Sequence, residues 1–171
     1  SLESLGKPMA RKESAGILMY RFCDSRLEVF LVYPGGPYWA KKDAGAWSIP
    51  KGEFSEKEDR FSAAKREFRE ETGFVPEGNF VPLRPVRQPG GKVVYAWVIK
   101  GDCDAKTIVS NRFSIEWPPR SGKYQEFPEV DRAGWFAMDV AREKILKGQL
   151  GLLEELSQMV ERDLASGNKQ A

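Results

Sequence analysis

Residues Gly52–Phe74 read GEFSEKEDRFSAAKREFREETGF, and this stretch decides the fold. Its spacing predicts a turn, a helix and a stop. Ser55 followed three residues later by Glu58 has the pattern of a capping box, so we expect the helix to begin there. The alanines, arginines and glutamates that follow favour a helix. Gly73 stands where a left-handed C-terminal cap is expected.

An acidic arc lies on one side of the predicted helix. Glu67, Glu70 and Glu71 are spaced i, i+3 and i+4, so their side chains are neighbours. Three carboxylates at that spacing repel one another unless positive charge lies among them. Arg66 can neutralise part of the charge through Glu70, one turn on. The remaining charge suits a hard divalent cation such as Mg²⁺, which takes carboxylate oxygens as ligands.

The alternative interpretation of this arc is a solvated, charged helix face, which would be the better one for such a run considered alone. The surrounding sequence favours a site instead. Gly52 and Gly73 border the run, and Glu58 stands between them. Phe61 and Phe68 fall on one apolar stripe, so the same helix can also pack against a sheet.

These residues resemble the signature of the Nudix hydrolase family. The family's box is Gly-x5-Glu-x7-Arg-Glu-U-x-Glu-Glu-x-Gly-U, where U is a bulky apolar residue, and every charged and glycine position is matched. Phe68 and Phe74 occupy the U positions, where the family more often has Ile, Leu or Val. The resemblance implies an α/β/α sandwich with a mixed β-sheet, in which the box forms a loop-helix-loop.

The resemblance also implies roles for the box residues. The ligands of Mg²⁺ or Mn²⁺ would be the glutamates of the arc and one backbone carbonyl: Glu67, Glu70, Glu71 and the carbonyl near Lys51–Gly52. Arg66 would orient the glutamates, and Glu58 would support the helix or the outer metal shell. Gly73 would have a structural role at the end of the helix.

The reaction that such a site supports is attack of water on phosphorus. A carboxylate must take the proton, and members of the family use either a box glutamate or a loop glutamate. Glu67 and Glu70 are the box candidates here. Glu129, shortly before the last expected strand, resembles the family's outer glutamate. Glu126 is the second candidate in that loop and a candidate substrate contact. Ordinary loop charge is the alternative for both loop residues.

The loop before the box is the expected place for substrate contacts, because loops beside a rigid site commonly hold binding residues. Tyr38 and Trp39 can stack on a base, and loop-anchoring packing is an equally open interpretation. Lys51 adjoins the box glycine, so its ammonium group is placed to reach phosphate oxygens.

The rest of the chain predicts one mixed α/β domain. Residues 118–134 have the polar composition of a long functional loop. The expected strands are 14–20, 27–33, 47–49, 79–86, 92–99, 112–117 and 134–138, and the expected helices after them are 139–147 and 150–165. We divide the chain into a poorly ordered N-terminal extension (1–13), a single domain (14–166) and a polar tail (167–171).

Composition narrows the function classes. A chain of 171 residues at 41% hydrophobic content has an adequate core for one domain. Its net charge of +2, from 27 basic and 25 acidic residues, gives no signal for DNA or membrane binding. The histidine count of zero excludes Ser-His and Cys-His nucleophiles. Cys23 and Cys103 are expected to be buried thiols rather than a disulfide, which favours the cytoplasm.

The sequence thus predicts a divalent-metal-dependent hydrolase that cleaves a phosphoanhydride in a nucleoside-diphosphate-linked substrate, such as an NTP, a dinucleoside polyphosphate or ADP-ribose. The substrate signals diverge. Trp47–Glu53 resembles the dinucleoside polyphosphate and diphosphoinositol phosphate branch, whereas Pro89 stands where ADP-ribose hydrolases sometimes have proline. The longer run Gly35–Glu53 resembles bacterial members described as predicted NTP pyrophosphohydrolases. The alternative is a catalytically idle Nudix domain that binds or senses nucleotides, which the intact box disfavours. The family likeness leaves a homodimer open.

Overall fold

The computed structural model describes residues 12–167. Its centre is a pair of long strands, β1 (Glu13–Cys23) and β2 (Arg26–Pro34), which run antiparallel. Asp24 and Ser25 both have positive φ and form the tight turn between them. The two strands are therefore longer, and their connection shorter, than the sequence predicts.

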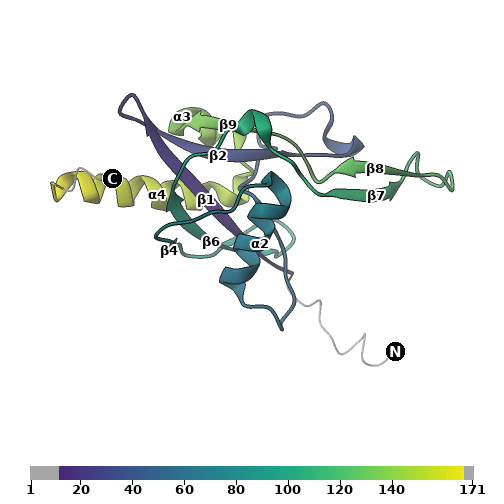
Figure 1. Ribbon diagram of the computed structural model, residues 1–171, viewed down its shortest axis with the longest axis horizontal. Coiled ribbons are helices and arrows are strands. Elements are labelled where there is room, and N and C mark those ends of the chain that lie inside the picture. The colour runs from purple at the N-terminus through teal and green to yellow at the C-terminus, as the bar shows by residue number, and fades with distance from the viewer. Residues whose placement is uncertain (1–11, 168–171) are drawn as a thin grey trace.

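A mixed sheet is built around β1 in the order β4-β6-β1-β2-β9 (Figure 1). The remaining strands of the sheet are β3 (Lys51–Glu53), β4 (Val81–Pro82), β5 (Val86–Arg87), β6 (Val93–Lys100) and β9 (Val130–Ala137). β6 runs parallel to β1, β2 runs antiparallel to β1, and β9 runs antiparallel to β2. The predicted mixed sheet is confirmed. The expected strand over residues 79–86 is replaced by two short strands, β4 and β5, each paired with β6.

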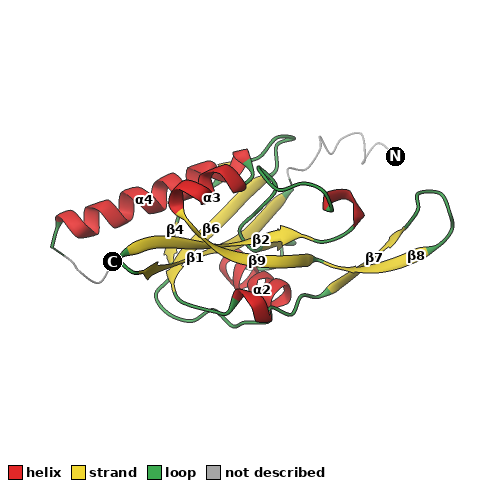
Figure 2. Ribbon diagram, turned by 90° about the horizontal axis from the view of Figure 1, so that it is seen from above, coloured by secondary structure: helices red, strands yellow, loops and turns green. Residues whose placement is uncertain are grey.

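Helices cover both faces of this sheet. Helix α2 (Arg60–Thr72) lies on one face, and α3 (Met138–Lys144) and α4 (Leu150–Ala165) lie on the other (Figure 2). Three short 3-10 helices connect the elements: η1 (Pro37–Trp39), η2 (Ala105–Thr107) and η3 (Lys147–Gln149). The α/β/α layering implied by the family resemblance is thus observed.

The core consists of two clusters separated by the sheet, because successive side chains of a strand point to opposite faces. Along β1, Ile17 packs in the cluster that contains Phe68 of α2, whereas Leu18 packs in the cluster that contains Leu152 and Leu156 of α4. This two-sided burial explains why the central strands read as nearly continuous apolar runs.

The strands β1 and β2 separate at one end, and residues 46–51 fill the gap between them. The N–H of Ile17 in β1 donates to the carbonyl of Pro50, and on the other side Val32 of β2 exchanges two hydrogen bonds with Ser48. Regular strand structure begins at Lys51, so the expected strand at 47–49 is reduced to isolated bridges. This inserted segment brings residues 51–53 beside α2.

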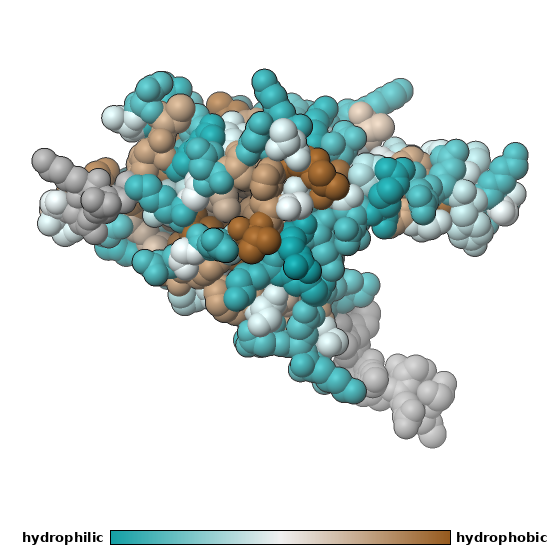
Figure 3. All heavy atoms as spheres, viewed as in Figure 1, coloured by the Kyte–Doolittle hydropathy of each residue, from teal (hydrophilic) through white to brown (hydrophobic). Residues whose placement is uncertain are grey.

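The expected polar loop at 118–134 is wrong in part. Strands β7 (Arg112–Glu116) and β8 (Tyr124–Pro128) form a separate two-stranded hairpin, and β9 already begins at Val130. The hairpin extends away from the body of the domain (Figure 2), and its surface is largely hydrophilic (Figure 3). The expected strand at 112–117 is confirmed as β7. Strand β8 lies within the expected loop, because the sequence of residues 124–128 lacks the apolar alternation that identifies a half-buried strand.

Both cysteines are free thiols, as predicted, but neither is buried: Cys23 is exposed and Cys103 is half-buried. Gly151 lies inside α4 and does not interrupt it. None of the helices in residues 12–167 has the length and apolar character that crossing a bilayer requires.

Candidate functional site

Helix α2, which carries the box glutamates, begins and ends at clear caps. Asp59 is the N-cap, and its carboxylate accepts a hydrogen bond of 3.0 Å from the backbone N–H of Ser62. The predicted capping box at Ser55 is therefore wrong, and the helix begins at Arg60. At the other end Gly73 has φ 83° and donates its N–H to the carbonyl of Arg69, which confirms the predicted left-handed cap.

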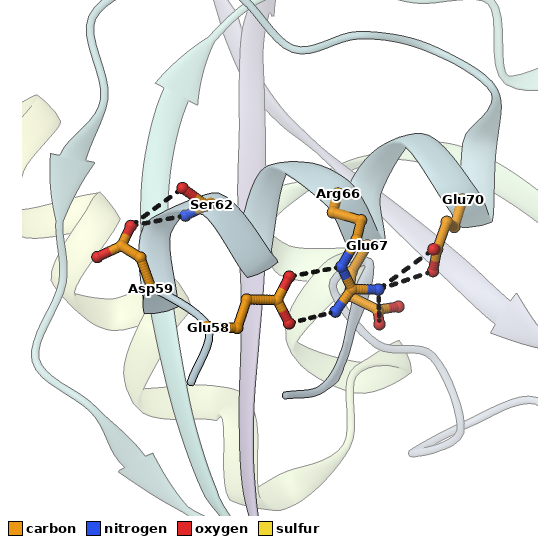
Figure 4. Close-up of polar contacts among 6 residues, drawn as sticks. All are labelled: Glu58, Asp59, Ser62, Arg66, Glu67 and Glu70. Carbon is orange, nitrogen blue, oxygen red and sulfur yellow. Dashed lines mark hydrogen bonds and ion pairs between the residues drawn. The ribbon is translucent and has the colours of Figure 1, made fainter. Parts of the chain in front are cut away.

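Arg66 lies at the centre of the carboxylates around α2 (Figure 4). Its guanidinium group makes a two-pronged contact with Glu58, at 2.7 and 2.9 Å. Its Nη1 atom also donates to Glu67 at 2.9 Å and to Glu70 at 3.1 Å. These contacts, with Glu58 first, raise the pKa of Arg66 and lower that of Glu58. Arg66 thus clamps the preceding loop to the helix and orients two of its glutamates.

Three carboxylates form an acidic cluster among the described residues. One oxygen from each of Glu67, Glu71 and Glu129 lies within 4.8 Å of the others. Glu67 and Glu71 come from α2, and Glu129 from the link between β8 and β9. The backbone of Glu129 is held by hydrogen bonds to Asn111 and from Gly35. The cluster therefore joins two of the box glutamates with the predicted loop glutamate, while Glu70 is paired with Arg66.

The protein environment disfavours negative charge in this cluster. Burial raises the pKa of all three carboxyl groups and is the largest cause in each case. The pKa of Glu71 is raised to about 8 by burial and by the charge of Glu67, although the N–H of Lys51 donates to its carboxylate at 3.2 Å. Ionisation of the whole cluster needs a compensating positive charge, and a hard divalent cation supplies that with oxygen ligands.

Gly52 allows the cluster to form. A Cβ atom at this position would overlap the carboxylate of Glu67, which lies directly against the backbone of β3. The carboxylate of Glu67 is held from the other side by Arg66. Only glycine fits at position 52 without displacing that carboxylate.

A pocket of about 320 Å³ adjoins the acidic cluster. Glu71 and Glu129 form part of its lining, together with Lys51 and the apolar side chains of Trp39 and Leu146. The pKa of Lys51 is lowered, mainly by burial, and the charge of the nearby Lys92 adds to the effect. The pocket thus combines carboxylates, half-buried cationic groups and an apolar wall.

Two of the four predicted substrate contacts line the pocket and the other two do not. Lys51 and Trp39 line the pocket, and Trp39 also packs against the core, so both interpretations of this side chain have support. Tyr38 is outside the pocket lining: it is 59% exposed and lies edge-on to Trp117, with ring centroids 5.3 Å apart. Glu126 is in the hairpin strand β8, where it pairs with Arg112 at 3.6 Å.

Sequence reasoning missed two side chains of the pocket, Gln88 and Lys92. Both belong to the turn between β5 and β6, which the sequence marks only by Pro89, Gly90 and Gly91. It also missed Gln149, a fully buried polar residue that packs behind Gln88. Glutamines in a turn and before a helix carry no sequence signal for a site, because their role depends on which distant elements the fold brings beside them.

Comparisons with known proteins agree with this architecture. Residues 11–156 match the family model described as the NUDIX domain. Solved structures with the same fold include an Ap4A hydrolase of C. elegans in a binary complex, with TM-score 0.58, 22% identity and coverage of 88% of this chain and 98% of that one.

A second similar structure is the NUDIX domain of Shewanella oneidensis NrtR complexed with ADP ribose, with TM-score 0.61, 18% identity and coverage of 94% and 98%. A third comes from work on MutT of Aliivibrio salmonicida and Vibrio cholerae, with TM-score 0.51, 15% identity and coverage of 86% and 96%. None of the curated proteins compared with the chain matches it significantly.

Proposed function

The chain belongs to the NUDIX domain family, and from this premise we propose that it is a divalent-metal-dependent hydrolase that cleaves a phosphoanhydride bond in a nucleoside-diphosphate-linked substrate. One observation carries the proposal. The acidic cluster of Glu67, Glu71 and Glu129 lies at a pocket that also contains cationic and apolar side chains. Those are the groups that a nucleotide with a metal-bound diphosphate requires.

The residues present fit a divalent cation. Three carboxylate oxygens lie within 4.8 Å of one another, and oxygen ligands suit Mg²⁺ or Mn²⁺. We assign Glu67, Glu71 and Glu129 as the ligands, with the backbone carbonyl at Gly52 as a further candidate. We keep Glu70 as an outer partner, because it is not in the group of carboxylates whose oxygens lie within 4.8 Å of one another. When bound, the cation would lower the pKa of a water and neutralise phosphate charge.

The remaining charged residues have roles that follow from their contacts. Lys51 is placed to bind a phosphate oxygen, because it lines the pocket beside Glu71. Arg66 holds Glu67 in position and Glu58 supports Arg66. The proton of the attacking water must go to a carboxylate. Glu129 is the stronger candidate, since it comes from a different segment and lines the pocket. Glu67 and Glu70 are the alternatives within the box.

The experiment is hydrolysis of a substrate panel with Mg²⁺ or Mn²⁺, with products separated by chromatography. The panel contains dinucleoside polyphosphates, ADP-ribose and nucleoside triphosphates, since Ap4A hydrolysis and ADP ribose binding are named for two similar structures. Glu71→Gln and Glu129→Gln are expected to reduce turnover at least a hundredfold. Glu126→Gln, an exposed hairpin glutamate, is the matched control and should keep it.

The alternative function is a catalytically idle module that binds nucleotides. Tight binding of a panel member without product, unchanged by Glu71→Gln, would support this module and contradict the hydrolase. The proposal extends to residues 14–166 as the functional domain and to the cytoplasm as its location. The first strand begins at Glu13, and the N-terminal extension and the tail lie almost entirely outside the described residues.

A further inference from the structure

A buried glutamine connects the pocket wall to the interior. Gln149 is 0% exposed, and the hydrogen bonds of its amide are of defined polarity. The backbone N–H of Ile49 donates to its Oε1 atom at 3.1 Å. Its Nε2 atom donates to the hydroxyl of Ser48 and to the Oε1 atom of Gln88, both at 2.9 Å. Residues far apart in the chain thus form one hydrogen-bonded relay.

The polarity of this relay is fixed from one end. A backbone N–H is only a donor, so the atom of Gln149 that faces Ile49 must be its oxygen. The nitrogen of Gln149 then faces Gln88, and the atom of Gln88 that receives its hydrogen bond must be oxygen. Within residues 12–167 the Nε2 group of Gln88 has no hydrogen-bond partner, so it is the branch of the amide that remains for a ligand. Since Gln88 lines the pocket, the relay determines which end of this amide a ligand meets.

The backbone around Gln88 is also held in place. Its N–H donates to the carbonyl of Lys92 at 2.7 Å, and its carbonyl accepts from Gly91 at 3.1 Å, which closes the turn. Gly148 of η3 lies so close that a Cβ atom there would be 2.8 Å from the Cα of Gln88. Both the main chain and the amide orientation of Gln88 are thus defined before any ligand arrives.

We propose that Gln88 is a specificity-determining residue that donates a hydrogen bond to an acceptor on the edge of a nucleobase, and that Gln149 is the residue that positions it. The inference rests on the proposed function, because it takes the pocket as the nucleotide site. The lining contains cationic groups that suit phosphate, Lys51 and Lys92, and also the neutral amide of Gln88 and the apolar side chains of Trp39 and Leu146. A planar base with a carbonyl or ring nitrogen fits that combination.

Discrimination follows from the fixed polarity. A glutamine that can turn over accepts or donates equally well, and so tolerates either kind of base edge. Held by Gln149, Gln88 offers only N–H groups. A base that presents an amino group at this point leaves two donors facing each other, and sites built around one hydrogen-bond partner reject its opposite strongly.

The test measures binding rather than turnover. The probes are AMP, GMP, CMP and UMP, with inorganic pyrophosphate as the base-free probe, titrated in the presence of Mg²⁺. Gln88→Met, which keeps the length but removes the amide, is expected to weaken the best-bound monophosphate about tenfold. Pyrophosphate affinity should stay within about twofold. Gln125→Met, on the exposed hairpin strand, is the matched control.

Three results would overturn the role of Gln88. The first is equal binding of all four monophosphates by the wild-type protein, and the second is unchanged monophosphate affinity in Gln88→Met. The third is an equal loss of pyrophosphate affinity in Gln88→Met, which would place the contact on phosphate. Gln88→Glu, which puts an acceptor in place of the donor, should reverse the order of preference among the bases. An unchanged order would also contradict the proposal.

Gln149 needs a readout that a merely structural role would not move. In Gln149→Met the ratio of the dissociation constants of the worst-bound and best-bound monophosphates should fall at least threefold, although Gln88 is intact. Gly148→Ala displaces Gln88 but leaves the buried amide of Gln149 in place, so it should lower this ratio as well. This variant replaces Gln149→Met if the latter does not fold. An unchanged ratio in a folded variant would overturn the positioning role. Base discrimination without hydrolysis of any substrate would contradict the proposed function alone.

Discussion

At the scale of single residues, the site depends on one missing side chain. Gly52 leaves room for the carboxylate of Glu67 against the backbone of β3, and Arg66 donates a hydrogen bond to that carboxylate. The box glycine and the box glutamate therefore contact each other directly. Sequence spacing places both residues in the same motif. Only the packing of β3 against α2 explains why both are needed.

Gly52→Ala tests this contact. Gly52 is not among the glycines with positive φ, so the backbone accommodates alanine, and the added methyl group must displace the carboxylate of Glu67. We expect the variant to fold, its affinity for Mg²⁺ to fall at least tenfold and its turnover to fall about a hundredfold. Isothermal titration and the hydrolysis assay measure both. Metal affinity equal to that of the wild-type protein would show that the glycine has no role in the cluster.

The raised pKa of Glu71 predicts how stability depends on pH in the metal-free protein. The ordinary value of 4.5 applies in the unfolded chain, and burial with the charge of Glu67 raises the pKa to about 8 in the folded protein. Between these values the folded state binds more protons, so the free energy of unfolding falls as pH rises, by at most about 1.4 kcal/mol per unit. Thermal melts from pH 5 to 8 in EDTA should show this decline.

Glu71→Gln is the matched variant for that decline, because an amide cannot ionise. We expect a shallower pH dependence and, at pH 8, a higher melting temperature than that of the metal-free wild-type protein, together with loss of turnover. Glu161→Gln, an exposed change on α4, should follow the wild-type curve. A wild-type melting temperature that rises from pH 5 to 8 would contradict the assigned direction.

At the scale of elements, the start of α2 shows how local sequence can offer two solutions. Ser55 and Asp59 are both good N-cap residues, and the capping-box spacing favours Ser55. In the structure Glu58 does not reach back to Ser55, because its carboxylate is held by Arg66 at 2.7 and 2.9 Å. Because Glu58 is bound to Arg66, the capping box of Ser55 and Glu58 does not form, and Asp59 is the N-cap instead.

A pair of alanine substitutions separates the two caps. Asp59→Ala removes the acceptor for the N–H of Ser62 and should cost about 1 kcal/mol of unfolding free energy. Ser55→Ala should change it by less than about 0.5 kcal/mol, because the hydrogen bond of Ser55 to Glu58 uses its backbone carbonyl. Urea denaturation measures both. A larger effect at Ser55 than at Asp59 would restore the capping box.

Much of the architecture was predictable from such local patterns. The central strands, α2 and its cap at Gly73, α4 and the mixed sheet follow from apolar runs, helical periodicity and glycine placement. Strand β7 corresponds to the expected strand at 112–117, but its partner β8 did not follow, because residues 124–128 have no apolar alternation. The inserted segment at 46–51 did not either, since its hydrogen bonds come from β1 and β2 rather than from a regular partner.

The candidate site was predictable to a similar extent. Helical spacing identifies Glu67, Glu70 and Glu71 as neighbours but cannot show which of them faces the pocket. The structure decides this through the approach of Glu129, which lies near Glu67 and Glu71 and comes from a distant part of the sequence. Gln88 and Gln149 depend wholly on tertiary contacts.

At the scale of the molecule, the acidic cluster joins parts of the chain that are distant in sequence. Glu67 and Glu71 are on α2, whereas Glu129 enters from the β8–β9 link. A cation bound there would connect the helix on one face of the sheet to the segment that leads into its edge strand. Any ligand that binds only the folded state stabilises it.

Addition of Mg²⁺ or Mn²⁺ is therefore expected to raise the melting temperature. At a hundred times the dissociation constant the gain is about 2.7 kcal/mol, or roughly 5–10 °C for a domain of this size. Glu129→Gln should reduce the shift by more than half, and Glu126→Gln should leave it unchanged. Equal shifts in both variants, measured by scanning calorimetry, would remove Glu129 from the ligand set.

The hairpin of β7 and β8 has a practical consequence for protein engineering. Its tip carries Arg120 and Gly122 in left-handed backbone conformations, and a side chain at Gly122 would meet nothing within 4 Å. Exposed loop tips of this kind tolerate inserted segments best. A fluorescent reporter or an affinity epitope inserted at this tip would extend outward and leave the acidic cluster and its pocket free for immobilised assays.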